Sequence, residues 1–143
     1  MAKLFKSGIM NTLDNIVQIE IPSLKDPRGS LAIIEGEVLP FSVERVYYLY
    51  DVPSDAYRGG HAHKSLVQCL VALSGSFEVL VDDGLNQRRI MLNKPDIGLL
   101  IPSGIWRELD NFSSGSVCLV LASEVFDESD YIRDYNEFKD SKI

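Results

Sequence analysis

The sequence is poor in histidine, cysteine and positive charge. It has only two histidines and two cysteines in 143 residues, and 14 lysines and arginines stand against 21 acidic residues, for a formal net charge of −7. A surface that binds nucleic acid relies on clustered lysine and arginine, so this balance argues against a nucleic-acid partner. It still permits a small anionic ligand held by a few local arginines.

Long hydrophobic runs are also missing. No apolar run approaches the roughly 18 residues of a membrane span, and the start, "MAKLFKSGIMNTLDN", has no uninterrupted apolar block. We therefore predict neither a membrane segment nor a secretory signal. Cys69 and Cys118 each lie in an apolar, strand-like run, as expected of buried free thiols in a reducing compartment. We expect a cytoplasmic protein with a single domain over residues 1–143.

The dominant pattern is a series of short β-like runs separated by turn residues. "IVQIEI" alternates apolar and polar side chains, and "VERVYYLYDV" is rich in β-branched and aromatic residues. The segments "DPRGS", "SGS" and "DDG" read as turns between successive runs. This spacing predicts an all-β fold, an antiparallel sandwich or barrel.

The C-terminus departs from this pattern. Within "SDYIRDYNEF", Ser129 is a plausible N-cap with acidic neighbours in the first turn. The large apolar and aromatic side chains then recur at helical spacing, namely Tyr131, Ile132, Tyr135 and Phe138. We expect a closing helix here that packs an apolar stripe on the barrel.

The two histidines lie in "RGGHAHK", separated by one alanine. Residues two apart in a strand point to the same face, so His61 and His63 project together. A small β-barrel can enclose a cavity that holds one ligand. Two imidazoles aimed into it could bind a metal, move protons or pack in the core. Their ordinary pKa, near 6.5, suits proton transfer around neutrality.

Two motifs resemble those of the cupins, which fold as jelly-roll barrels. "GHAH" with Gln68 resembles the first motif, and "PSGIWRELDN" with Arg107 resembles the second. In metal-binding cupins these motifs supply three histidines and a glutamate. Here Gln68 stands in the place of the glutamate and Arg107 in the place of the third histidine. Arginine has no lone pair to give and stays protonated, so we predict no metal and no other cofactor.

Several side chains near the histidine pair suit an anionic, hydroxylated ligand. Arg58 precedes the pair, Arg107 is predicted to face the same cavity, and Arg28 lies in the turn "DPRGSL". A planar guanidinium makes bidentate contacts with phosphate, so three arginines near one cavity indicate a diphosphate or a nucleotide sugar. Solvated surface arginines are the alternative. Lys64 and Gln68 complete the candidate substrate-binding set.

A closer resemblance runs from about residue 26 to residue 138. Its most specific pieces are "RGGHAH" and "DESDYIRDY". With these motifs the chain resembles the sugar 3,4-ketoisomerases, which act on dTDP-4-keto-6-deoxyglucose. The resemblance implies a metal-free cupin homodimer that exchanges N-terminal strands, for which "IVQIEI" is a candidate. It also implies that the paired histidines and a tyrosine of "RVYYLY" are catalytic. Motif spacing favours Tyr47, while Tyr48 and Tyr50 lie on the opposite strand face and stay as alternatives.

The implied reaction moves a ketone from C4 to C3 of the sugar through an enediol, in the synthesis of deoxysugars for surface polysaccharides or antibiotics. One imidazole removes the C3 proton, while the other histidine and a tyrosine relay protons between oxygens. We hypothesise that His63 is the principal base and His61 its partner. A dTDP-sugar 3,5-epimerase and a non-catalytic nucleotide-sugar-binding cupin are the rival functions. The C4 configuration of the product stays open.

Overall fold

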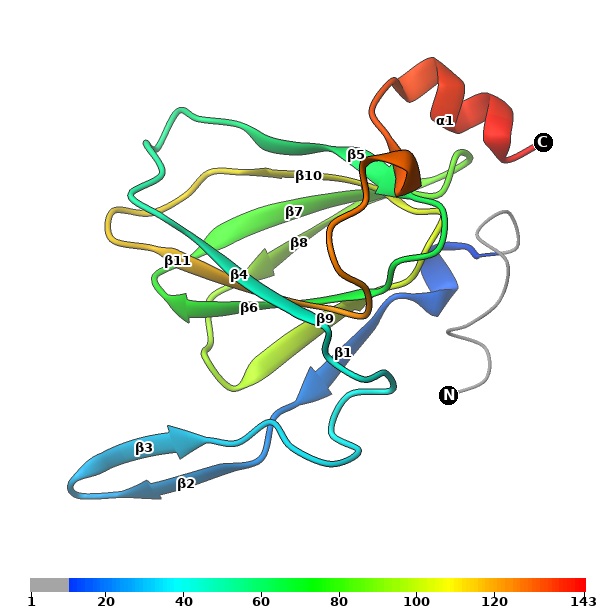
Figure 1. Ribbon diagram of the computed structural model, residues 1–143. Coiled ribbons are helices and arrows are strands. Elements are labelled where there is room, and N and C mark those ends of the chain that lie inside the picture. Colours follow the sequence, from blue (N-terminus) through cyan, green and yellow to red (C-terminus); the bar gives the residue numbers. More distant parts are fainter. Residues whose placement is uncertain (1–10) are drawn as a thin grey trace.

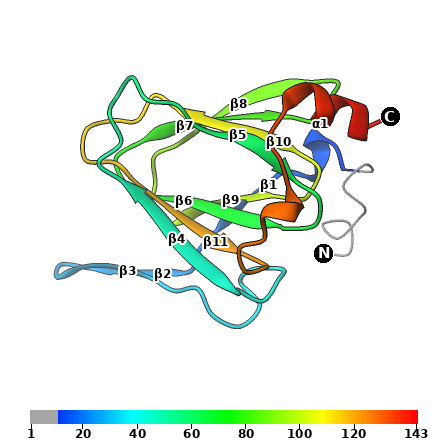
Figure 2. The same ribbon diagram turned by 45° about the horizontal axis from the view of Figure 1, so that its top comes forward.

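The alternating runs of the sequence form the strands of two facing antiparallel sheets. The computed structural model describes residues 11–143; the first ten residues of the segment judged against a secretory signal lie outside it. Each sheet has five strands, and a separate two-stranded hairpin lies beside them (Figures 1 and 2). This is the all-β, cupin-type jelly roll with a short C-terminal helix that the sequence predicts.

The strand bounds follow the runs identified in the sequence. The strands and the α-helix are β1 (Val17–Glu20), β2 (Ser23–Asp26), β3 (Gly29–Ala32), β4 (Arg45–Tyr50), β5 (Arg58–His63), β6 (Gln68–Ser74), β7 (Phe77–Asp82), β8 (Gln87–Leu92), β9 (Ile97–Ile101), β10 (Trp106–Asp110), β11 (Val117–Ala122), β12 (Tyr131–Ile132) and α1 (Tyr135–Ser141). One sheet has the order β1-β9-β6-β11-β4 and the other β12-β5-β10-β7-β8.

Glycines make the tight connections between paired strands. Gly75 links β6 to β7 at a φ of +66°, and a Cβ there would collide with the Ser113 hydroxyl and the Ser116 backbone. Gly84 closes the β7–β8 hairpin at a φ of +96°, as the "DDG" turn predicts. Because side chains resist this left-handed region, the two turns depend on glycine.

The main hydrophobic core fills the space between the two sheets. Phe77 of β7 stacks on Phe112 with ring centroids 5.3 Å apart, and both side chains are buried. Alternate residues of β6, β9 and β11 reach inward to the same core, because successive strand residues face opposite sides. The apolar packing thus holds the sheets apart at a fixed spacing and leaves the polar interior residues of β4, β5 and β10 on a rigid frame.

The outer face of the β1-containing sheet has its own apolar layer. Ile34, Leu39 and Phe41, from the segment between β3 and β4, pack against Cys69 and Val71 of β6. Among the described residues, the β2–β3 hairpin before this segment pairs only with itself, with Leu24 opposite Leu31, and it projects away from the barrel (Figure 1).

The C-terminal helix begins later in the sequence than predicted. Ser129 is not its N-cap: residues Glu128–Asp130 form a 3₁₀ turn, and β12 follows it, pairing with β5. The α-helix begins only at Tyr135, where the Asp134 carboxylate accepts a hydrogen bond from the Glu137 backbone N–H. Strand pairing with β5 outweighs the helical periodicity of this segment, because it gives hydrogen-bond partners to backbone groups that would otherwise be buried without them. Among residues 11–143, no helix is long and apolar enough to span a membrane.

Candidate active site

The two histidines point into the interior from the same strand, as the alternation of β5 predicts. Their ring centroids lie 4.9 Å apart in an edge-to-face arrangement. His61 lines a small cavity of about 80 Å³ between the sheets, whereas His63 is fully buried and is not part of its wall. The cavity wall consists of Tyr47, Leu49, Arg58, Gly59, His61, Gln68, Leu70, Arg107, Leu109 and Val120.

Arg107 lies beside His61 on the neighbouring strand. β10 pairs with β5 so that Arg107 is in register with His61, and the arginine side chain is almost completely buried. Its Nη1 donates to Gln68 Oε1 at 2.7 Å, and its Nε and Nη2 donate to the Ile105 carbonyl at 3.2 and 3.0 Å. These acceptors fix the guanidinium plane, and no carboxylate of residues 11–143 forms an ion pair with its positive charge.

Gln68 connects this guanidinium to Tyr47 across the two sheets. The Gln68 Nε2 donates to the Tyr47 hydroxyl at 3.2 Å. Since that hydroxyl oxygen is the acceptor here, its own proton is available to a ligand in the cavity. Tyr48 and Tyr50 are on the exposed face of β4, so Tyr47 is the tyrosine of "RVYYLY" that reaches the interior.

Burial in the interior shifts the pKa of each of these groups in the direction that favours its neutral form. Burial, helped by the charge of Arg107, lowers the pKa of His61 to about 3 and also lowers the pKa of His63. Burial lowers the pKa of Arg107 to about 10 and raises that of Tyr47. Near neutral pH the site therefore holds two neutral imidazoles, a protonated phenol and a fixed cation.

Sequence analysis did not identify Asp130 or Tyr131 as residues of the site. The His63 Nδ1 lies 3.0 Å from Asp130 Oδ2, and the Tyr131 ring centroid lies 4.4 Å from that of His63 and 5.0 Å from that of His61. Both residues belong to "DESDYIRDY", which the family resemblance already marked as specific. Sequence analysis missed them because it interpreted the segment as a helix that packs on the barrel.

Arg45 is a further site residue that sequence analysis missed. Its guanidinium carbon lies 4.5 Å from the centre of the Tyr47 ring, and its Nη1 donates to the Tyr131 hydroxyl at 3.4 Å. A signal was present, because Arg45 is two residues from Tyr47 and so shares its face of β4. Arg45 thus joins the strand tyrosine to the C-terminal tail.

The remaining predicted binding residues are not all brought to the cavity. Arg58 is exposed and lines the cavity mouth. Lys64 is exposed and does not line it, although its backbone N–H donates to the Asp130 carbonyl. Arg28 lies at the tip of the projecting hairpin, where its 90% exposed side chain pairs with Asp26 at 2.7 Å. Within one chain, Arg28 and Lys64 are therefore not part of the site.

The residues present do not suit a divalent metal. Residues 11–143 contain no group of three or more histidine, cysteine or acidic side chains placed to hold one ion. A buried guanidinium sits next to His61 instead, and it would repel a dication at close range. We therefore derive no step through a metal.

Several known proteins are similar to this chain in sequence and in fold. A curated relative from Aneurinibacillus thermoaerophilus, TDP-4-oxo-6-deoxy-alpha-D-glucose-3,4-oxoisomerase, is 48% identical over 122 residues, covering 85% of this chain and 88% of the relative. The 3,4-ketoisomerase QdtA from Thermoanaerobacterium thermosaccharolyticum, solved as a mutant with TDP-4-keto-6-deoxyglucose, is 41% identical with a TM-score of 0.89, covering 92% of this chain and 96% of that one.

Two further structures place the fold in a wider context. WlaRB, a TDP-quinovose 3,4-ketoisomerase from Campylobacter jejuni, is 44% identical with a TM-score of 0.85, covering 90% of this chain and 99% of that one. NovW, a 4-keto-6-deoxy sugar epimerase from Streptomyces spheroides, is 15% identical with a TM-score of 0.68, covering 81% of this chain and 67% of that one, and shows a shared fold alone. The family profile described as "FdtA: WxcM-like, C-terminal" matches residues 14–143. The chain belongs to this WxcM-like FdtA family.

Proposed function

We propose that the chain is a 3,4-ketoisomerase that converts dTDP-4-keto-6-deoxyglucose into its 3-keto isomer without a metal. The observation that carries this proposal is the cavity in which the neutral imidazole of His61 lies beside the buried cation of Arg107. The activity printed for the 48% identical relative and the sugar bound to QdtA identify the same class of substrate.

The first step removes the proton at C3, which the neighbouring C4 carbonyl acidifies. The neutral His61 takes this proton, and the electron pair moves toward the C4 oxygen to give an enediolate. Arg107 lies on the same wall of the cavity, so its fixed charge favours the developing oxyanion. Return of a proton at C4, with loss of the C3 hydroxyl proton, leaves a ketone at C3, so no oxidant or reductant is consumed.

Tyr47 suits the proton exchange at oxygen. Its hydroxyl accepts from Gln68 and keeps its own proton, because burial raises its pKa. It can therefore donate to the C4 oxygen and later accept from the C3 hydroxyl, which balances the transfer at carbon.

For the carbon base we propose His61 in preference to His63. From the sequence we hypothesised His63, yet His61 lines the cavity while His63 is fully buried behind it. A general base must reach the proton that it removes, directly or through one water. We therefore assign the carbon base to His61 and a supporting role to His63.

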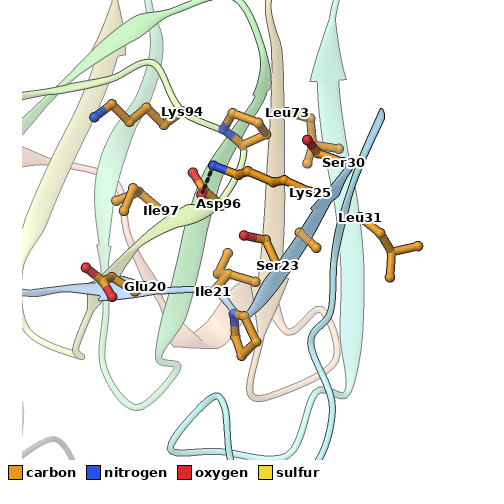
Figure 3. A pocket seen from close by; sticks show the side chains of 13 residues that line it. Glu20, Ile21, Ser23, Lys25, Ser30, Leu31, Leu73, Lys94, Asp96 and Ile97 are labelled. Carbon is orange, nitrogen blue, oxygen red and sulfur yellow. Dashed lines mark ion pairs between the residues drawn. The ribbon is translucent and has the colours of Figure 1, made fainter. Parts of the chain in front are cut away.

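For the substrate's phosphates we propose the cavity mouth, where the exposed Arg58 supplies a positive charge. We further propose that a second copy contributes Arg28. Beside the hairpin lies a groove of about 1040 Å³, crossed by an ion pair of 3.4 Å between Lys25 and Asp96 (Figure 3). Leu24 and Leu31 are 64% and 56% exposed on the hairpin. Burial of this apolar surface on a second chain would favour a strand-exchanged homodimer, in which we propose that Arg28, at the hairpin tip, reaches the partner's site.

The exchanged segment in this proposal is the hairpin rather than "IVQIEI" alone. β1 already pairs with β9 of its own chain, starting at Val17↔Leu100, whereas the hairpin has no other strand beside it in the described part of the chain. We also propose a single cupin domain and a cytoplasmic location, with which the two buried, unpaired thiols agree.

The test is incubation with dTDP-4-keto-6-deoxyglucose in deuterated water, followed by NMR. A ketone at C3 with deuterium at C4 is the expected product. A ketone that stays at C4 with deuterium at C3 or C5 would identify an epimerase instead. Binding without any deuterium in the ring would identify a nucleotide-sugar-binding protein.

A further inference from the structure

Asp130 holds His63 through a carboxylate–imidazole contact that comes from the C-terminal tail. The Asp130 Oδ2 lies 3.0 Å from His63 Nδ1, and both side chains are buried, with exposed fractions of 8% and 0%. The carboxylate itself is held in place, because Oδ1 accepts from the Ser65 backbone N–H and hydroxyl at 2.8 and 2.9 Å, and Oδ2 accepts from the Leu66 N–H at 3.3 Å.

This geometry fixes the tautomer of His63. A neutral imidazole carries one proton, and an ionised carboxylate can only accept, so the proton belongs on Nδ1. The lone pair is then on Nε2. The Nε2 atoms of both His63 and His61 are buried and have no hydrogen-bond partner among the described residues.

We propose that Asp130 is a positioning residue for catalysis: it sets His63 in the Nδ1–H tautomer and leaves its Nε2 lone pair facing the interior, next to His61. The tail thus supplies a third member to the pair, in the order Asp130, His63, His61, ending at the cavity wall. This inference rests on the proposed ketoisomerase function, in which His63 supports the base.

A purely structural role for Asp130 would be satisfied by its bonds to Ser65 and Leu66 alone. A positioning role makes a different demand, because it requires an acceptor that faces Nδ1. The substitution Asp130→Asn tests this demand. An amide has one acceptor oxygen, and when that oxygen stays with the Ser65 donors, an N–H₂ group replaces Oδ2. It gives up the bond from the Leu66 N–H, and it faces His63 Nδ1 and forces the ring proton onto Nε2. The tautomer of His63 separates the two roles, because loss of the Leu66 bond alone would not change it.

The experiment combines ¹⁵N NMR of the histidine rings with steady-state kinetics. The chain has only two histidines, so spectra of ¹⁵N-histidine protein are assigned with one His61→Asn sample. We expect the Nδ1–H tautomer at His63 in the wild type and the Nε2–H tautomer in Asp130→Asn. We expect kcat to fall about 10²-fold in this variant, with KM for the nucleotide sugar little changed.

Asp134→Asn is the matched control, because it makes the same chemical change in the same tail at an exposed helix N-cap, where asparagine serves as well as aspartate. It is expected to keep the wild-type tautomer and kcat. An unchanged kcat in Asp130→Asn would overturn the proposal. So would a wild-type proton on Nε2, which is measured without any substitution and so does not depend on how a variant folds. Wild-type protein with no ketoisomerase activity would contradict the proposed function, a result separate from the tautomer.

Discussion

At the scale of single residues, two side chains separate this site from a metal-binding cupin. Gln68 and Arg107 take the places of the carboxylate and the third imidazole, and the structure joins them by a hydrogen bond of 2.7 Å. In the proposed mechanism the guanidinium supplies the positive charge that a metal would otherwise bring to the enediolate oxygen. Sequence comparison within the cupin motifs was sufficient to identify both residues.

We predict that the double substitution Gln68→Glu and Arg107→His creates a metal site. It removes the buried cation and adds an anionic and a neutral donor near His61 and His63. Zn²⁺ binding measured by calorimetry should approach one ion per chain in this variant and be negligible in wild-type protein. Stoichiometric Zn²⁺ in the wild type, or chelator-sensitive turnover, would contradict the metal-free mechanism.

The base assignment gives a second prediction at this scale. His61→Asn should lower kcat by about 10²- to 10⁴-fold, the contribution typical of a general base, with substrate affinity largely kept. Tyr48→Phe, on the exposed face of β4, should behave as wild type. If His61→Asn turns over normally while His63→Asn does not, the carbon base is His63.

At the scale of elements, alternation was a good guide and helical periodicity was not. The period of two correctly predicted that both histidines of "RGGHAH" share one face and that Tyr47 lies on the face of "RVYYLY" opposite Tyr48 and Tyr50. The tail kept its helical spacing but forms a turn and a short strand before α1, because β5 offers it an edge to pair with. Its contribution of Asp130 depends on that long-range pairing, which no local pattern of the tail contains.

The β2–β3 hairpin carries the prediction for assembly. Leu31→Asp places a charge on the apolar face that we propose to be buried in the dimer, so the protein should shift toward the monomer in analytical ultracentrifugation. Leu85→Asp, at a 90% exposed position of the β7–β8 turn, is the control and should leave the assembly unchanged. A wild-type monomer at micromolar concentration would contradict the proposed exchange.

The same substitution separates assembly from catalysis. If Arg28 completes the partner's site, monomeric Leu31→Asp protein should show a raised KM for the nucleotide sugar. Arg28→Ala should raise KM in the same direction while the dimer persists. Equal KM values in Arg28→Ala and wild-type protein would remove Arg28 from the binding set.

At the scale of the whole molecule, the buried histidines couple stability to pH. Burial lowers the pKa of His61 to about 3 and also lowers that of His63, whereas both titrate near 6.5 when the chain unfolds. Below pH 6.5 the two histidines therefore bind protons in the unfolded chain but not in the folded one. The free energy of unfolding should therefore decrease as the pH is lowered below 6.5, by up to about 1.4 kcal/mol per pH unit for each histidine.

Urea unfolding between pH 7 and pH 5 measures this loss. The variant with His61→Asn and His63→Asn should show a flatter dependence over the same interval, since the remaining carboxylates are common to both proteins. A wild-type stability that is constant or rises toward pH 5 would contradict the neutral, buried imidazoles on which the mechanism depends.

The position of the ketone is the most direct test of the central claim. Chelator-treated wild-type protein and His61→Asn are each incubated with dTDP-4-keto-6-deoxyglucose in deuterated water and followed by NMR. A metal-free ketoisomerase with His61 as base predicts a C3 ketone carrying deuterium at C4 in the wild type, and almost none in the variant. A sugar that keeps its C4 ketone under wild-type protein would contradict the account.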